Sequence, residues 1–297
     1  MAPGQWKEVV SESGGHIYGR LRYIEYKRAI FKICSQPSLT RVLGPIVLAE
    51  GSKVESRYRT QFRTVKDLLR QIDHFDYVRF VLDPSVTNFS AFQSSNYLIS
   101  LEHTLILDCT VSVDELWRNF KDKTRNVIRK AAKFLTLVDL HDPQEFMRLY
   151  LHHLGTRKCY FDPLAVKRIY HAVSEHKQGR IVTAVDNDGL VHAMIFTLWD
   201  ERHYYYFLSS RDPDVADNGA TSLLLWNALQ HAHALSLQFD FDGVSSESRY
   251  HFMAAFGGRV AARLIVQKST FLFALLKNGR RLLDKYGGNP RNYFLGD

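Results

Sequence analysis

The sequence predicts a mixed α/β protein with two consecutive domain-sized halves. Its 297 residues exceed the usual size of one domain, and 45% of them are hydrophobic, which supplies material for packed cores. Short apolar runs bounded by glycine, proline or asparagine occur in both halves and are typical of strands. Segments with apolar residues every three to four positions separate these runs and predict amphipathic helices. This composition excludes a disordered or low-complexity chain.

The first half is expected to begin with short strands and turns between Gly15 and Glu50, including "HIYGRLRYIEYKR" and "VLGPIVLAEG". A helix is predicted from Ser56 to Gln71. It is followed by the strand "YVRFVLDP", which the Asp83-Pro84 pair closes. Another strand, "HTLILDCT", comes after a loop rich in serine and asparagine. This order predicts one mixed α/β domain over residues 1–111.

Residues 112–135 predict a single basic helix. Ser112 and Glu115 form a capping-box pattern, and apolar residues recur at helical spacing at Val113, Leu116, Trp117, Phe120, Val127, Ile128 and Ala131. The other side carries the cations Arg118, Lys121, Lys123, Arg125, Arg129, Lys130 and Lys133. Such a face is either an ordinary solvated surface or a site for phosphates or an acidic polymer. The phosphate interpretation assigns binding to Lys123, Arg125, Arg129 and Lys130.

Residues 136–297 predict a second domain in which antiparallel strands precede alternating helices and strands. Helices are expected from Pro143 to Leu154 and from Pro163 to His176. The strands "RIVTAVD", "LVHAMIFTLWD" and "RHYYYFLSS" follow, the first two joined by a tight Asn-Asp-Gly turn. A helix and the strand "LQFDFDG" come next. A helix through "SESRYHFMAAF", ended by Gly257-Gly258, precedes the last strand, "RVAARLIVQKS".

The stretch "DNGATSLLLWNALQHAHALSLQFDFDGV" joins a glycine turn, an apolar helix and a strand with two aspartates. Asp217 or Asn218 can cap the helix, and Gly219 is expected to leave room for a ligand at its first turn. Unpaired N–H groups and the dipole make such a helix start a natural anion site. The stretch is therefore either a phosphate site or simply a well-capped helix.

Two aspartates are candidates for proton transfer. Period-two alternation places Asp240 and Asp242 on the strand face opposite Phe239 and Phe241. A carboxylate there could accept the proton of an amine nucleophile, or it could cap the next helix. We expect Asp242 to be the cap and Asp240 to be the base.

Tyr206 and Lys268 complete the catalytic candidates. The hydroxyl of Tyr206 could protonate a leaving group, although a tyrosine on a half-buried strand more often packs. Lys268 ends the last strand, where a cation could stabilise a phosphate or an oxyanion, although a lysine there is usually solvated.

The order of the second half resembles the GNAT acyltransferase fold, in which a helix after an antiparallel meander receives the pyrophosphate of coenzyme A. "DNGATSLLLWNALQHAHALSLQFDFDGV" and "SRYHFMAAFGGRV" are similar to the C-terminal half of the Fem-like acyltransferases. "KTRNVIRKAAK" resembles the segment that joins their two domains, and "LTRVLGPIV" resembles part of the first. The resemblance implies two tandem GNAT-like domains, each a mixed, largely antiparallel sheet flanked by helices. The tail from about residue 277 would then return to the N-terminal domain.

This resemblance implies transfer of an acyl group from acyl-CoA to an amino group of a sugar, a cell-envelope precursor or a small molecule, by direct attack of the amine. Some members resemble peptidyltransferases that use aminoacyl-tRNA. The implied donor-binding residues are Ser209, Ser210, Arg211, Asn218, Gly219, Ala220 and Thr221. However, "ADNGAT" lacks the leading basic residue and the second spaced glycine of the usual phosphate loop. A nucleic-acid-binding module without catalysis and a GNAT-like scaffold that binds a partner are the alternatives.

Charge and composition add broader expectations. The net charge of +8 favours anionic partners such as a coenzyme phosphate, tRNA or an anionic membrane. The odd number of widely spaced cysteines, Cys34, Cys109 and Cys159, is typical of a reducing compartment. No signal peptide and no run of ~20 apolar residues is recognisable, which predicts a cytoplasmic protein.

The C-terminal apolar run and the histidine pairs allow two further expectations. The apolar run from Phe271 to Leu276, with Lys277, Arg280 and Arg281, either contacts an anionic membrane or packs on the first domain. No metal site is predicted, because neighbouring histidines should point apart in the pairs His152 with His153 and His231 with His233.

Overall fold

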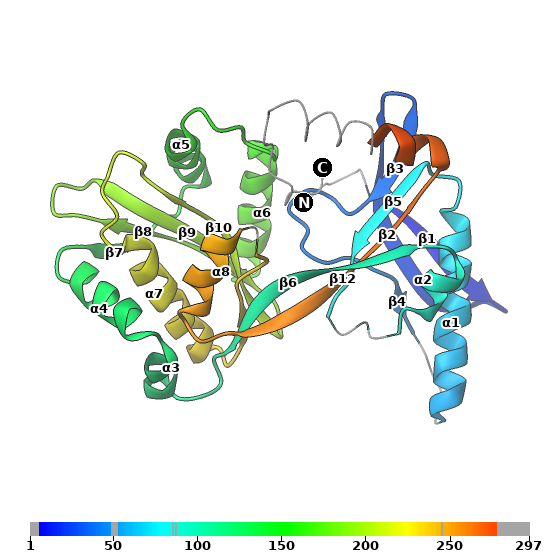
Figure 1. The fold of residues 1–297 in the computed structure, drawn as a ribbon, viewed down its shortest axis with the longest axis horizontal. Helices are drawn as coiled ribbons and strands as arrows, with labels where there is room; N and C mark the ends of the chain where they lie inside the picture. Colours follow the sequence, from blue (N-terminus) through cyan, green and yellow to red (C-terminus); the bar gives the residue numbers. More distant parts are fainter. Residues whose placement is uncertain (1–5, 49–52, 85, 87, 245, 278–297) are drawn as a thin grey trace. The chain divides into compact units, whose positions relative to one another are not determined.

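The structure is a computed structural model that describes residues 6–48, 53–84, 86, 88–244 and 246–277 (Figure 1). Of these, the residues up to Glu102 and those from Ala262 onward form one compact unit, and the residues from His103 to Ala261 form the other. The chain crosses between the units inside strand β6 (Leu98–Asp108) and returns near the start of strand β12 (Arg259–Ser269). These limits differ from the predicted boundaries at 111 and 135. The reason is that the helices after β6 pack in the second unit, while β12 pairs with a strand of the first.

The first unit contains a mixed sheet in the order β1-β2-β3-β5-β12, with β4 paired to β2. Neighbouring strands are antiparallel except β3 and β5, which are parallel. Helix α1 (Val54–Gln71) connects this parallel pair and confirms the helix predicted from Ser56 to Gln71. The other elements are β1 (Trp6–Ser13), β2 (His16–Arg28), β3 (Phe31–Ser35), β4 (Ile46–Val47), β5 (Tyr77–Val81) and α2 (Ser90–Ser94).

The second unit contains a sheet in the order β6-β11-β10-β9-β8-β7. Its pairs are antiparallel except β10 and β11, which are parallel and joined by α7. The strands are β7 (Thr136–Asp139), β8 (Gly179–Val185), β9 (Val191–Trp199), β10 (His203–Arg211) and β11 (Gln238–Asp240). The helices are α3 (Val113–Asn119), α4 (Asp122–Ala131), α5 (Pro143–Leu154), α6 (Pro163–Glu175), α7 (Ala220–Ala234) and α8 (Glu247–Ala254). The predicted fold class is therefore confirmed: each unit is a mixed, largely antiparallel sheet with flanking helices.

The predicted basic helix over residues 112–135 is in fact two helices, α3 and α4. Ser112 caps α3 as expected, with its Oγ accepting from the N–H of Glu115 at 3.2 Å. Phe120 then adopts an extended backbone, and its buried ring packs against Trp226 and Phe256. The prediction of one helix is wrong because burial of Phe120 turns the chain between the two basic segments.

Side chains of β10 and β11 alternate between two packed faces. Tyr204, Tyr206 and Phe239 join a core with residues of α3, α4 and α7. Phe207 lies on the other face against Phe196, which also contacts the ring of Phe146 on α5. In the described part of the chain, no helix combines the length and apolarity that a membrane crossing requires.

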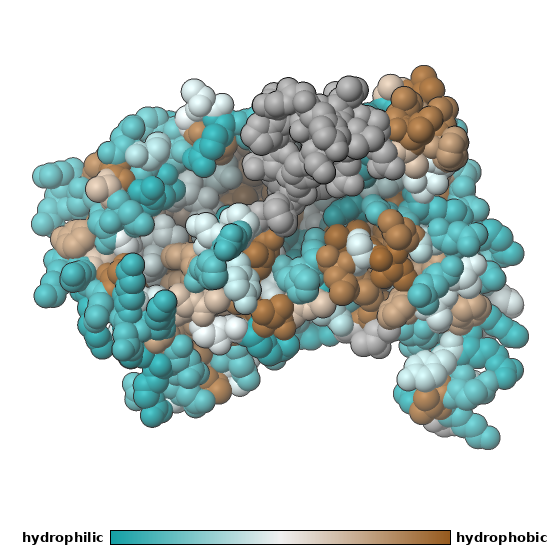
Figure 2. Space-filling view, in the orientation of Figure 1, coloured by the Kyte–Doolittle hydropathy of each residue, from teal (hydrophilic) through white to brown (hydrophobic). Residues whose placement is uncertain are grey.

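The helical turn 271–277 belongs to the first unit. Phe273 is buried against Phe31 and Tyr77, whereas Phe271 is 84% exposed. Figure 2 shows the apolar side chains of this turn gathered at the surface. Arg280, Arg281 and the rest of the predicted tail lie outside the described residues.

Candidate functional site

The second unit opens between its two parallel strands. β10 and β11 pair only through His203–Gln238, Tyr204–Phe239 and Tyr205–Asp240. Beyond these pairs β10 continues along β9 as far as Arg211. The chain after β11 instead follows β6, because the N–H of Phe241 donates to the carbonyl of Leu105 at 3.0 Å. The strands therefore diverge, and one edge of residues 206–211 is left outside the β10–β11 ladder.

A helix starts at the wide end of this divergence. The β10–α7–β11 crossover places the start of α7 at the carboxyl end of β10, where α/β folds commonly bind ligands. Asp217 accepts from the N–H of Gly219 and Asn218 accepts from the N–H of Ala220, each at 3.2 Å. The N–H groups of Thr221 and Ser222 come next and have no partner inside a helix at these positions. They are the donors that an anion would meet.

Gly219 does not leave the predicted space for a ligand at the first turn of α7. It caps α7 with φ of 87°, a left-handed conformation that favours glycine. A Cβ added there would lie 2.4 Å from Cγ1 of Val127 and 3.2 Å from its carbonyl oxygen. The prediction of room at Gly219 is wrong because α4 fills it, and the glycine permits this close contact between α4 and α7.

Asn218 is positioned by a chain of polar contacts. Its Nδ2 lies 2.6 Å from Nδ1 of His192, whose Nε2 lies 2.7 Å from Oδ2 of Asp186. His192 is buried and belongs to β9. The contacts fix the Asn218 amide so that its oxygen can accept from Ala220 at the start of α7. Neither His192 nor Asp186 was among the residues predicted for the site.

Asp240, rather than Asp242, makes the structural hydrogen bonds at the end of β11. Asp240 is buried and accepts from the hydroxyl of Thr104 and from the N–H of Asp242 at 2.8 Å. Asp242 has a left-handed backbone with φ of 63°. Helix α8 is capped by Ser246, whose Oγ accepts from the N–H of Arg249. The prediction that Asp242 is the helix cap is therefore wrong, and Asp240 supports the turn after β11.

The site residues predicted at the end of β10 lie in different surroundings and do not form one group. The hydroxyl of Tyr206 contacts that of Ser209 within the packed face, and burial raises the pKa of Tyr206. Arg211 is exposed and donates to the carbonyl of Val215 at 2.8 Å. Ser210 turns to the opposite side and lies 2.8 Å from Nδ1 of His153 on α5. The structure thus brings Ser210 together with a histidine that sequence reasoning did not select.

His153 links Ser210 to a buried carboxylate. The ring is 1% exposed, and its Nε2 lies 3.9 Å from Oδ2 of Asp212. Burial lowers the pKa of His153 below its ordinary value, which favours a neutral ring at pH 7. No sequence pattern indicated this group, because α5 and the end of β10 are far apart in the chain.

Lys268 belongs to the first unit. It forms an ion pair with Asp73, and its ammonium lies 5.7 Å from the ring centre of Tyr97. Lys268 and Asp73 line a surface depression together with Lys66, Arg70 and Asn96. The other catalytic candidates, Asp240, Asp242 and Tyr206, belong to the second unit.

The four cations proposed to bind phosphate are not equivalent. Arg125 is partly buried and donates to the carbonyls of Arg118 at 2.8 Å and Phe120 at 2.9 Å, so it stabilises the end of α3. Arg129 lies over the ring of Trp117 at 5.3 Å. Lys123, Arg129 and Lys130 are exposed, and the surface around α4 is hydrophilic (Figure 2). These three remain available to an anion.

The comparisons with known proteins agree with this geometry. Residues 118–251 match the family described as "Acetyltransferase (GNAT) domain". This match lies within the second unit, where the resemblance placed a GNAT-like domain. No curated protein sequence was found to match the chain.

Solved structures extend the likeness over both units. FemX superposes with a TM-score of 0.69 at 12% identity, covering 92% of this chain and 90% of FemX. L-PGS from Bacillus licheniformis gives a TM-score of 0.56 at 12% identity, covering 93% of this chain and 89% of that one. A tandem GNAT protein from the clavulanic acid biosynthesis pathway gives 0.56 at 13% identity, with 90% and 84% covered. The chain thus has the tandem GNAT fold seen in the Fem-like branch.

Proposed function

We propose that this protein is an N-acyltransferase that takes its acyl group from acyl-CoA and transfers it to an amine. The observation that carries the proposal is the divergence of β10 and β11 beyond Tyr205 and Asp240, at the start of α7. An extended thioester donor fits such an edge because backbone groups can hydrogen-bond along it. The match of residues 118–251 to the GNAT acetyltransferase domain supports the same chemistry.

In this proposal the donor phosphates meet the N–H groups of Thr221 and Ser222, and the acyl chain follows the exposed edge of β10. The amine attacks the thioester carbonyl, the carbon–sulfur bond breaks, and coenzyme A leaves as the thiolate. Asp240, at the narrow end of the divergence, is the proposed acceptor of the amine proton. The acceptor would be an amino sugar, a cell-envelope precursor or a small amine in the cytoplasm.

Binding of acetyl-CoA to Thr221→Pro tests the phosphate site. Proline is tolerated in the first turn of a helix and removes one N–H, whereas Thr221→Ala keeps that group and serves as the matched control. Calorimetry should show weaker binding to Thr221→Pro, by about tenfold, which is the loss of one charge-assisted hydrogen bond. Equal affinity in both variants, with unchanged melting temperatures, would exclude this helix start as the phosphate site.

Asp240→Asn tests the proton acceptor in an acetyl-CoA consumption assay with a panel of amines. The amide keeps an oxygen that can accept from Thr104 and from the N–H of Asp242, but it removes the negative charge. Turnover should fall by roughly 10²-fold while acetyl-CoA affinity is retained. Asp242→Asn is the control and should change turnover less. Near wild-type turnover of Asp240→Asn across the pH range would exclude this assignment.

Aminoacyl-tRNA is the second donor candidate, and the exposed cations of α4 favour it. Lys123, Arg129 and Lys130 form a basic surface without the structural contacts that Arg125 makes. The triple change to Glu should weaken tRNA binding and reduce its salt dependence, because each contact with a phosphate releases a counterion. Arg125 stays unchanged so that the fold is kept. An unchanged affinity and salt slope would make this face an ordinary solvated surface.

A further inference from the structure

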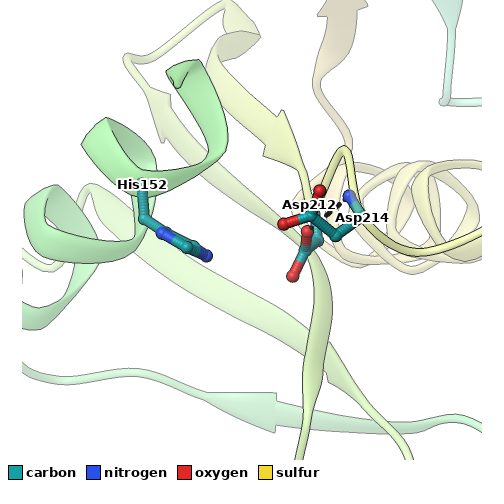
Figure 3. A group of neighbouring side chains, drawn as sticks. All are labelled: His152, Asp212 and Asp214. Atoms are coloured by element: carbon teal, nitrogen blue, oxygen red, sulfur yellow. Dashed lines mark hydrogen bonds between the residues drawn. The ribbon is translucent and has the colours of Figure 1, made fainter. Parts of the chain in front are cut away.

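Three side chains of metal-binding type converge beside the loop from β10 to α7. His152 lies in the last turn of α5, and Asp212 and Asp214 follow β10 directly. One ligand atom from each lies within 4.8 Å of the others. Figure 3 shows the imidazole of His152 pointing from its helix toward the two carboxylates. We propose that His152, Asp212 and Asp214 form a binding site for a divalent transition-metal ion.

Asp212 is a buried carboxylate whose negative charge a bound cation would compensate. It is 6% exposed, and within the described residues its Oδ1 accepts one hydrogen bond, from the N–H of Asp214 at 2.9 Å. Its Oδ2 lies 3.9 Å from Nε2 of His153, which is beyond hydrogen-bond distance. Among the described residues, neither Asp212 nor Asp214 has an ion pair with a lysine or arginine. Two adjacent carboxylates, one of them buried, repel each other, and a bound cation would remove this repulsion.

The donor set selects the class of ion. One imidazole nitrogen with two carboxylate oxygens suits Zn²⁺ or Mn²⁺, whereas Ca²⁺ and Mg²⁺ prefer oxygen ligands alone. Ligand atoms must approach to about 2.0–2.2 Å from Zn²⁺. His152 and Asp214 are exposed and free to rotate inward, while burial holds Asp212 in place. Three protein ligands leave coordination positions open for water or for an anionic group of a substrate.

A second histidine lies beside the buried ligand. Nδ1 of His153 is 2.8 Å from the hydroxyl oxygen of Ser210, and its Nε2 is 3.9 Å from Oδ2 of Asp212. Metal-binding carboxylates commonly have such polar neighbours, and a small movement of the Asp212 side chain would bring the two groups into hydrogen-bond contact. Sequence spacing predicts no metal site here, because His152 and its neighbour His153 point apart on α5. The partners of His152 come from the loop after β10, which a spacing argument along α5 does not reach.

The cation would also change the charge of the loop that leads to α7. That loop contains "ADNGAT" and lacks the basic residue of the usual phosphate loop. A divalent ion held by Asp212 and Asp214 would neutralise the two negative charges on the same connection, which lessens their repulsion of an anionic donor. Metal binding itself does not depend on the proposed acyl transfer, and it is measured without donor or acceptor.

Calorimetric titration of the chelator-treated full chain with ZnCl₂, and separately with MnCl₂, tests the site. We expect one ion per chain and tighter binding of Zn²⁺ than of Mn²⁺. His152→Ala and Asp214→Asn should each weaken Zn²⁺ binding at least tenfold, and both replace exposed side chains, so folding is preserved. Co²⁺ bound in place of Zn²⁺ should give a visible absorption spectrum that these variants lose.

The matched controls are His176→Ala and Asp188→Asn, which alter exposed residues outside the cluster and should leave the affinity unchanged. Asp212→Asn is measured together with its melting temperature, since the residue is buried. Wild-type affinity in His152→Ala or in Asp214→Asn would overturn the proposal. A stoichiometry that follows the number of surface histidines, rather than one ion per chain, would overturn it as well.

Discussion

The two units contain the same motif, a pair of parallel strands joined by a helix, and they differ in what lies beyond the pair. In the first unit β3 and β5 pair through Ile33–Tyr77, Cys34–Val78 and Ser35–Arg79, with α1 between them. In the second unit β10 and β11 pair over three positions as well, with α7 between them. In the first unit β12 pairs antiparallel with β5, and in the second unit β6 pairs antiparallel with β11.

The first unit joins its strands again after the parallel pairs. The side chain of Gln36 accepts from the N–H of Val81 at 2.8 Å and donates to the carbonyl of Thr40 at 2.7 Å. The N–H of Leu43 also donates to the carbonyl of Val81 at 2.8 Å. The chain after β3 therefore covers the end of β5, whereas the chain after β11 follows β6. The first motif is closed by the loop after β3, whereas in the second motif residues 206–211 of β10 lie outside the pairing with β11.

The largest expected effect concerns the start of α7 in the second unit, where Gly219 packs against Val127 of α4. Gly219→Val should destabilise the protein by about 3 kcal/mol, since it combines a strained positive φ with a clash against Val127. Thermal unfolding measures the loss. Gly189→Val is the matched control, because Gly189 also has a positive φ, of 82°, but nothing within 4 Å of an added Cβ.

The difference between these two glycine variants isolates the contact with α4. Adding Val127→Ala to Gly219→Val should recover much of that difference, because it removes the methyl group 2.4 Å from the new Cβ. Equal losses in Gly219→Val and Gly189→Val would show that backbone strain alone explains the glycine and that α4 yields without cost.

A smaller loss is expected for Arg125→Ala, which removes the link between α3 and α4. Its guanidinium donates to the carbonyls of Arg118 and Phe120, so the change should lower the free energy of unfolding by about 2 kcal/mol. Lys130→Ala, an exposed cation on the same helix, should cost less than about 0.5 kcal/mol. Denaturant titration compares the two. Similar small losses would return Arg125 to the set of phosphate-binding candidates.

Gln36→Ala tests the closure of the first unit. Loss of the amide leaves the N–H of Val81 without its acceptor and should cost about 1–2 kcal/mol. Acetyl-CoA affinity, measured by calorimetry, should stay unchanged because the proposed donor site lies in the second unit. A change in acetyl-CoA affinity, or binding of a second acetyl-CoA, would contradict this. It would show that the hydrogen bonds of Gln36 prevent donor binding in the first unit.

Local patterns were sufficient to predict most elements of both units. The helices at Pro143–Leu154 and Pro163–Glu175 begin with Asp-Pro, and in each the aspartate caps the helix. The strand "FDFDG" alternates as expected, with Phe239 and Phe241 in the core and Asp240 on the other face. These features depend on neighbours in the sequence, so the sequence alone contains the information.

The errors arose where distant residues decide the structure. Phe120 interrupts the basic helix because its ring packs with Trp226 and Phe256, and Gly219 is occupied because Val127 lies against it. The groups around His153 and His192 depend on contacts between elements far apart in the chain. Composition and spacing along one segment carry no signal for such contacts, so the site was predicted only in outline.

The smallest expected effect compares one hairpin carboxylate in each unit by its response to acid. A hydrogen bond from Arg22 lowers the pKa of Glu8 in the first unit, and one from His192 lowers the pKa of Asp186 in the second. A lowered folded-state pKa adds stability above the unfolded pKa, near 4, and that stability is lost as the pH falls through the folded value.

Glu8→Gln and Asp186→Asn should therefore each melt slightly below wild type at pH 6, and this difference in melting temperature should shrink toward pH 3. Melting temperatures of wild type and of both variants across this range check the prediction. If the gap for Asp186→Asn stays constant with pH, the bond between Asp186 and His192 does not depend on the carboxylate charge.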